Sequence, residues 1–134
     1  MVPQLAVPLG VGAAMAAGAA YVVANPPGDG GLYPPCAFHA VTGLWCPGCG
    51  ITRGVHAMLT GDLGAAIGFN LFTPIVVVAA IVGWITWVQH TRGRTLPWSG
   101  RRPPPAWFVV LPAVLVVYAV LRNLPVAPFD ALAP

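Results

Sequence analysis

Hydrophobic residues in this chain gather in long stretches that are separated by short polar segments. A helix needs about 20 apolar residues to cross the roughly 30 Å hydrocarbon core of a bilayer. Three stretches meet that length, and they cover residues 2–24, 63–88 and 107–124. The pattern therefore predicts an all-α fold with three transmembrane helices in a single domain, residues 1–134.

Turn-forming residues mark the limits of these stretches. The first ends at Asn25-Pro26-Pro27-Gly28, and Pro103-Pro104-Pro105 precedes the third. Inside the second stretch, Pro74 removes a backbone donor and is expected to kink the helix. The composition agrees with a membrane protein, because 57% of the residues are hydrophobic and only 7% are charged.

The few charges predict an orientation. The chain contains no Lys and no Glu, and four of its six Arg residues lie within residues 89–106. Short loops that collect Arg and Lys are usually cytoplasmic. We therefore expect the 89–106 loop inside the cell and the 25–62 loop on the extracytoplasmic side.

The 25–62 loop carries the candidate chemistry, since it contains all three cysteines of the chain. Cys46-Pro47-Gly48-Cys49-Gly50 has the form of a turn that brings two sulfurs to one side. Cys36 and His39 repeat the same spacing and complete a C-x2-H-x6-C-x2-C pattern, which suits a tetrahedral zinc ion. His56 is the alternative fourth ligand.

The same cysteines also fit redox chemistry. A short interfacial helix is expected over residues 52–60, so Cys49 lies near a helix N-terminus, where the helix dipole and Arg53 favour a thiolate. Cys46 and Cys49 would then exchange disulfides, and Cys36 would resolve them. A static disulfide is a third possibility in an oxidising compartment, although it leaves one cysteine unpaired. The sequence leaves these three readings open.

Four polar residues near the cysteines have expected structural roles. We expect Thr52 to cap the short helix and Asp62 to cap the second span. Arg53 is expected to bond loop carbonyls, with a lipid phosphate or another anion as the alternative partner. Asn70 lies in an apolar stretch, and we expect it to hydrogen-bond another helix or the loop folded over it.

The motif around the cysteines resembles DUF2752, a family of small bacterial membrane proteins of unknown function. The resemblance covers roughly residues 33–80, and its most specific part is the CPGCG-x-TR core. The matching residues are Cys36, His39, Thr42, Gly43, Cys46, Pro47, Gly48, Cys49, Gly50, Thr52, Arg53, Gly61, Asp62 and Asn70. The chain departs from the family pattern at Ala37, where Pro is common, and at Asn70-Leu71, where the family has Asn-Pro. The resemblance implies a multi-pass protein of the bacterial cell membrane with a cysteine-rich loop, and it implies no activity.

These observations favour a non-enzymatic accessory or interaction protein. Its cysteine knuckle, closed by a disulfide or by zinc, would form a rigid platform for another membrane protein or a second copy of the chain. A membrane thiol-disulfide oxidoreductase and a metal or heme delivery factor are the alternatives. Nucleic acid is not an expected partner, because the basic residues lie at a membrane surface without a stacking platform.

Overall fold

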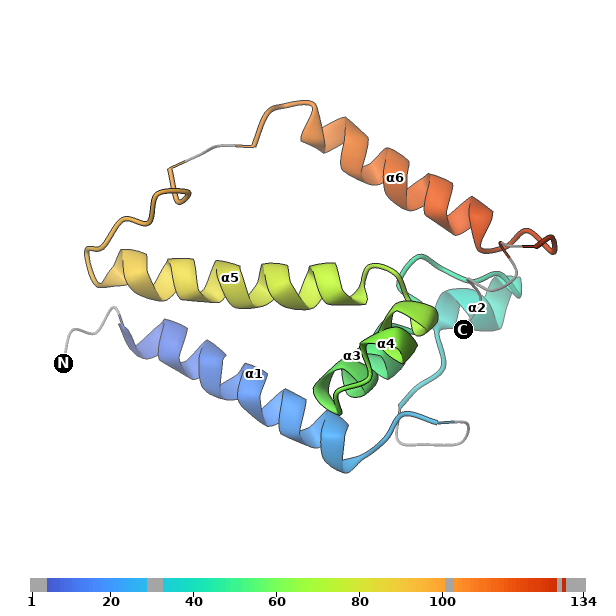
Figure 1. The fold of residues 1–134 in the computed structure, drawn as a ribbon, viewed down its shortest axis with the longest axis horizontal. Helices are drawn as coiled ribbons and strands as arrows, with labels where there is room; N and C mark the ends of the chain where they lie inside the picture. Colours follow the sequence, from blue (N-terminus) through green and yellow to red (C-terminus); the bar gives the residue numbers. More distant parts are fainter. Residues whose placement is uncertain (1–4, 29–32, 101–102, 128, 130–134) are drawn as a thin grey trace.

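The computed structural model describes residues 5–28, 33–100, 103–127 and 129 (Figure 1). Within these ranges every regular element is a helix, which confirms the predicted all-α class. The six helices are α1 (Ala6–Ala24), α2 (Ala37–Thr42), α3 (Ile51–Leu59), α4 (Leu63–Phe69), α5 (Thr73–Thr91) and α6 (Trp107–Leu121). Residues 2–4 of the first predicted span, and Arg101 and Arg102 of the arginine loop, lie outside the described residues.

α1 and α5 are in contact near the N-terminal end of α1 and diverge toward the end where α3 lies (Figure 1). Trp84 of α5 lies against Gly12 of α1, and its Nε1 donates to the Pro8 carbonyl at 2.8 Å. Each helix has 19 residues, or about 28 Å at 1.5 Å per residue. Both helices are therefore long and apolar enough to cross a membrane.

The predicted span over residues 63–88 is wrong as one continuous helix, because the structure divides it into α4 and α5. Asn70 breaks it by taking an extended conformation with φ −164°. Pro74 lies in the first turn of α5, where the missing backbone donor has no intrahelical partner to lose, so it begins a helix and does not kink one. Asp62 is the N-cap of α4, as expected, and accepts from the Ala65 amide at 2.8 Å.

α3 is the short helix predicted over residues 52–60, and it packs against α1, α4 and α5. Its buried positions, Gly54 and Ala57, are small, which allows the close approach. α2 was not predicted. It ends at Gly43, whose positive φ of 71° is a conformation that glycine adopts without strain.

α6 is shorter than the third predicted span and stands apart from the other helices over most of its length (Figure 1). Its 15 residues extend about 22 Å, less than a hydrocarbon core of about 30 Å. It contacts the rest of the described chain near its C-terminal end. There Asn123 accepts from the Trp45 amide and donates to the Trp45 carbonyl, both at 2.8 Å, and Tyr118 meets Phe72 edge to face.

Candidate metal and redox site

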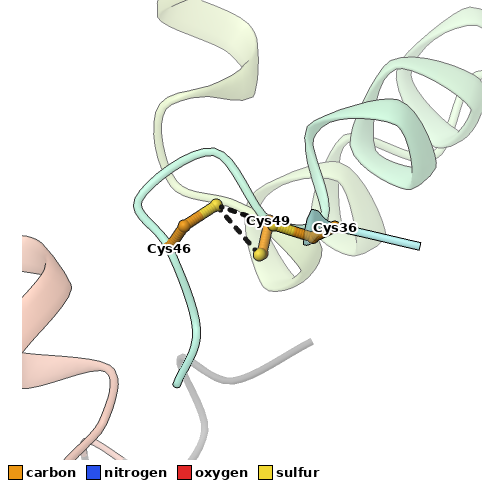
Figure 2. Close-up of side chains that lie close together, drawn as sticks. All are labelled: Cys36, Cys46 and Cys49. Atoms are coloured by element: carbon orange, nitrogen blue, oxygen red, sulfur yellow. Dashed lines mark hydrogen bonds between the residues drawn. The ribbon is translucent and has the colours of Figure 1, made fainter. Parts of the chain in front are cut away.

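The three cysteines come together beside the starts of α2 and α3 (Figure 2). Cys46 Sγ is 2.9 Å from Cys49 Sγ and 3.5 Å from Cys36 Sγ. All three sulfurs lie within 4.8 Å of one another. All three are free thiols, Cys49 is buried, and the other two are half-buried. We call these three residues the cysteine cluster.

Local backbone structure explains this convergence. Residues 46–49 form a four-residue turn in which the Cys49 amide donates to the Cys46 carbonyl at 3.1 Å. Pro and Gly occupy its two central positions, as such turns favour. Gly50 follows with φ 84° and is the N-cap residue of α3. Cys36, at the N-cap position of α2, brings the third sulfur from ten residues earlier in the chain.

Two buried side chains hold the backbone of this turn. Asn70 Nδ2 donates to the carbonyls of Pro47 and Cys49 at 2.8 and 2.9 Å. Arg122 Nη1 donates to the carbonyls of Cys46 and Cys49 at 2.9 and 3.1 Å. Both residues are only 1% exposed. The turn is therefore fixed from the junction of α4 and α5 and from the end of α6.

Sequence reasoning did not identify Arg122 as part of the site. Its guanidinium lies 5.2 Å from the centre of the Tyr118 ring, and its contacts with the cysteine turn join residues more than 70 positions apart. One signal was present in the sequence, because an ionisable residue at the end of an apolar stretch is costly there and often belongs to a site.

Neither predicted histidine ligand joins the cluster. His39 Nδ1 lies 3.2 Å from the Leu44 carbonyl, and its ring stacks on Trp45 with the centroids 3.9 Å apart. His56 lies on α3, and its buried Nε2 has no hydrogen-bond partner among the described residues. The group of mutually close ligand atoms contains the three sulfurs alone within the described ranges.

The remaining predicted residues lie on or beside α3. Thr52 is the second residue of this helix and does not cap it, so the predicted capping role is wrong; Gly50 takes the N-cap position without a side-chain bond. Arg53 is half-buried in the first turn of α3 and takes part in an interaction within the chain.

The environment gives the thiols different acidities. Hydrogen bonds to its sulfur, first from the His39 backbone amide and then from Cys49 and Cys46, lower the pKa of Cys36 to about 7. Burial, followed by the hydrogen bonds with Cys46 and Cys36, raises the pKa of Cys49 to about 12. Cys36 is therefore the more acidic of these two thiols.

This difference predicts the order of alkylation in reduced, metal-free protein. At pH 7.5, Cys36 is expected to react with iodoacetamide at least about 100-fold faster than Cys49, because the thiolate is the reactive form. A timed pulse of iodoacetamide followed by peptide mass spectrometry measures both rates in one sample. Equal rates at Cys36 and Cys49 would contradict the prediction, and urea-unfolded protein supplies the reference in which the two rates converge.

Three clustered thiols support two kinds of chemistry. Thiolates are the soft ligands that zinc and cuprous ions prefer, and three of them leave one position open in a tetrahedral site. The donor set fits such an ion, since the three sulfurs already lie within 4.8 Å of one another. The close Cys46 and Cys49 sulfurs, 2.9 Å apart, also stand where a disulfide forms with little movement.

Residues 36–84 match the model of a family described as protein of unknown function, DUF2752. The match covers the cysteine cluster, α2 to α4 and the first part of α5, and it confirms the resemblance seen in the motif. No curated protein and no solved structure matches the chain.

Proposed function

We propose that this chain, which belongs to the DUF2752 family through residues 36–84, is a multi-pass protein of the bacterial cell membrane with a structural metal site. The cysteine cluster binds one thiophilic ion, with zinc the first candidate, on the extracytoplasmic side. The protein is not an enzyme in this proposal. The metal-bound turn is a rigid platform for a partner membrane protein or a second copy of the chain.

The observation that carries the proposal is the convergence of three sulfurs from two separate segments. Cys36, Cys46 and Cys49 would hold the ion and the fourth ligand would come from outside the cluster. When bound, the ion supplies a cross-link between the starts of α2 and α3. The chain's own contribution is to fix the turn: Asn70 and Arg122 hold its carbonyls, so its sulfurs need little rearrangement to bind.

The membrane placement is supported by α1 and α5, which have the length and hydropathy of membrane spans. α6 is apolar around its whole circumference, and Phe108 and Val109 are 77% and 73% exposed. Such a helix is stable in lipid or against another helix and costs free energy in water. The Arg92 and Arg94 end of α5 faces the cytoplasm in this proposal, following the positive-inside rule.

A second candidate function is thiol-disulfide exchange, which the 2.9 Å approach of the Cys46 and Cys49 sulfurs favours. In this reaction a protein disulfide oxidises the pair. Cys46 and Cys49 lose two electrons and two protons and form a disulfide, and the substrate disulfide takes them up and becomes two thiols. If the substrate remains as a mixed disulfide on Cys46, Cys36 Sγ, 3.5 Å from Cys46 Sγ, would attack Cys46 instead of Cys49 doing so, which releases the substrate as a thiol and leaves a Cys36–Cys46 disulfide.

Elemental analysis of detergent-purified protein, prepared without chelator, separates the two functions when combined with thiol counting by intact mass. We expect about one zinc per chain and three free thiols after the metal is removed, in line with a structural zinc site. Cys49→Ser is expected to lose the zinc. His39→Gln and His56→Gln are matched variants outside the cluster, and loss of zinc in one of them alone would identify the fourth ligand.

Protein without metal, in which two thiols appear only after reduction, would refute the metal site. Exchange with a disulfide substrate would then support the oxidoreductase. A disulfide that does not exchange would instead indicate that the cysteines form a purely structural cross-link.

A further inference from the structure

The C-terminal end of α6 borders two adjoining open hollows. One, of about 310 Å³, lies beside Arg122 and Pro125, and the other, of about 380 Å³, lies beside Phe38, Val116 and Val120. Leu44, Trp45, Asn123 and Leu124 line both hollows. The two therefore form one groove with a polar end and an apolar end.

The polar end contains a buried cation with unused donors. Arg122 is 1% exposed, and Nη1 is the guanidinium nitrogen that donates to the turn carbonyls. Its Nε and Nη2 have no hydrogen-bond partner among the described residues. Two carbonyls and the Tyr118 ring do not neutralise a charge that is out of water, so the site favours an anionic group.

Carboxylates within the described chain do not supply that group. The chain has no Glu and three Asp residues, and Asp62 caps α4. Asp29 and Asp130 lie outside the described residues. No carboxylate among the described residues therefore pairs with Arg122, and a bound anion would supply the missing acceptor.

The order of the groove along α6 points to an amphiphile. The polar hollow lies at residues 122–125, just past the end of the helix, and the apolar hollow reaches back along it to Val116. In a membrane-embedded chain, the polar hollow past the end of α6 is nearer the lipid headgroups, and the apolar hollow along α6 is nearer the acyl chains. A phospholipid has the same polarity in the same direction.

We propose that this groove binds one anionic phospholipid. Its phosphate lies in the hollow that Arg122 lines, and an acyl chain lies along Phe38, Val116 and Val120. A helix from a second copy or a partner would fill the apolar end but would leave the cation without an anion, which is why lipid is the favoured occupant. The proposal rests on the membrane placement above and is independent of what the cysteines bind.

Native mass spectrometry of the detergent-purified full chain tests this, with phosphatidylglycerol and phosphatidylcholine of identical acyl chains as probes. We expect one phosphatidylglycerol per chain, bound about fivefold more tightly than phosphatidylcholine, which corresponds to about 1 kcal/mol for one cation near an anionic headgroup. Arg122→Gln should remove the preference and leave weak binding of both lipids. Arg94→Gln is the control, because it removes a cation beyond the far end of α5.

A second variant avoids the cysteine turn. Val120→Trp fills the apolar end of the groove and is expected to weaken both lipids equally while the turn stays intact. Val109→Trp, at a 73% exposed position of the same helix, should change neither affinity. Zinc measured on the same samples separates failure of this proposal from failure of the metal site.

Four results would overturn the proposal. The first is equal affinity for the two lipids in the unmodified chain. The second is a preference for phosphatidylglycerol that survives Arg122→Gln. The third is a dimer that excludes lipid until Val120→Trp disrupts it, which would assign the groove to a second copy. Displacement of the lipid by millimolar inorganic phosphate would also count against it, since the acyl chain would then contribute nothing.

Discussion

Replacing Asn70 with alanine is expected to lower the free energy of unfolding by about 3–5 kcal/mol, because several buried groups lose their partners together. Asn70 Nδ2 donates to the Pro47 and Cys49 carbonyls, and Oδ1 accepts from the Phe72 amide at 2.9 Å. The Cys49 carbonyl keeps its bond from Arg122, but the Pro47 carbonyl and the Phe72 amide lose the partners described for them. The variant therefore loosens the cysteine turn and the start of α5 at once.

Thermal unfolding in detergent, followed by tryptophan fluorescence, measures this loss. Asn25→Ala is the matched control, because the Asn25 side chain makes one exposed bond, to the Tyr21 carbonyl at 3.0 Å. Its expected cost is within about 0.5 kcal/mol, as for most surface substitutions. The alkylation rate of Cys49 is a second readout, and it should rise in Asn70→Ala alone. Unfolding of the two variants at the same temperature would show that Asn70 does not hold the turn.

Hydrophobic patterning predicted the helices of this chain better than their breaks. The bounds of α1, α3 and α6 each differ by at most a few residues from the bounds of a predicted segment. A long apolar run has few alternatives to a helix. The break at residues 70–72 was missed because one Asn hardly changes the mean hydropathy of a 26-residue window. Its cause is three-dimensional: the Asn70 amide bonds a loop more than 20 residues earlier in the chain.

In the candidate site, too, local features were predictable from the sequence and long-range contacts were not. The Cys46-x2-Cys49 turn is local, so the residue types between the cysteines were enough to predict that their sulfurs approach. The place of His39 was not predictable from spacing, because the ring stacks on Trp45 and its Nδ1 lies beside the Leu44 carbonyl. Arg122 was not predictable either, since its contacts depend on how the end of α6 folds back to the turn.

The family match covers only some of the side chains that hold the cysteine turn and its neighbouring residues. Asn70 lies inside residues 36–84 together with all three cysteines, whereas Arg122 and Asn123 lie beyond them, directly after the last residue of α6. The matched segment thus contains the turn and one of its two buried clamps. The second clamp links the turn to a helix that has few other contacts with the described chain.

Gly54→Leu is expected to destabilise the protein by about 3 kcal/mol or more, at the upper end of overpacking costs. Gly54 lies where α3 meets both α4 and α5. A Cβ at this position would contact the Thr73 hydroxyl and would lie 3.0 Å from the Ala66 carbonyl. Thr73 and Ala66 are both 0% exposed, so neither has free space to move into.

The smaller substitution, Gly54→Ala, sets the gain in helix propensity against the cost of overpacking. In an ordinary helix interior, Gly to Ala adds about 1 kcal/mol of stability. Gly54→Ala is nevertheless expected to be destabilising by up to about 2 kcal/mol, because an overpacking cost of about 1–3 kcal/mol outweighs that gain. Gly18→Ala in α1 is the control: nothing lies within 4 Å of its added Cβ, so it should be neutral or stabilising.

Thermal unfolding of Gly54→Ala, Gly54→Leu and Gly18→Ala in one detergent measures this order of stability. The zinc content of the same samples connects packing to the site, because Cys49 precedes the first residue of α3 by two positions and moves when α3 is pushed away. We expect zinc to fall in Gly54→Leu and to stay unchanged in Gly18→Ala. A Gly54→Leu protein as stable as the unmodified chain would mean that α3 is not held by close contact with α4 and α5, and that the cysteine turn is positioned by Asn70 and Arg122 alone.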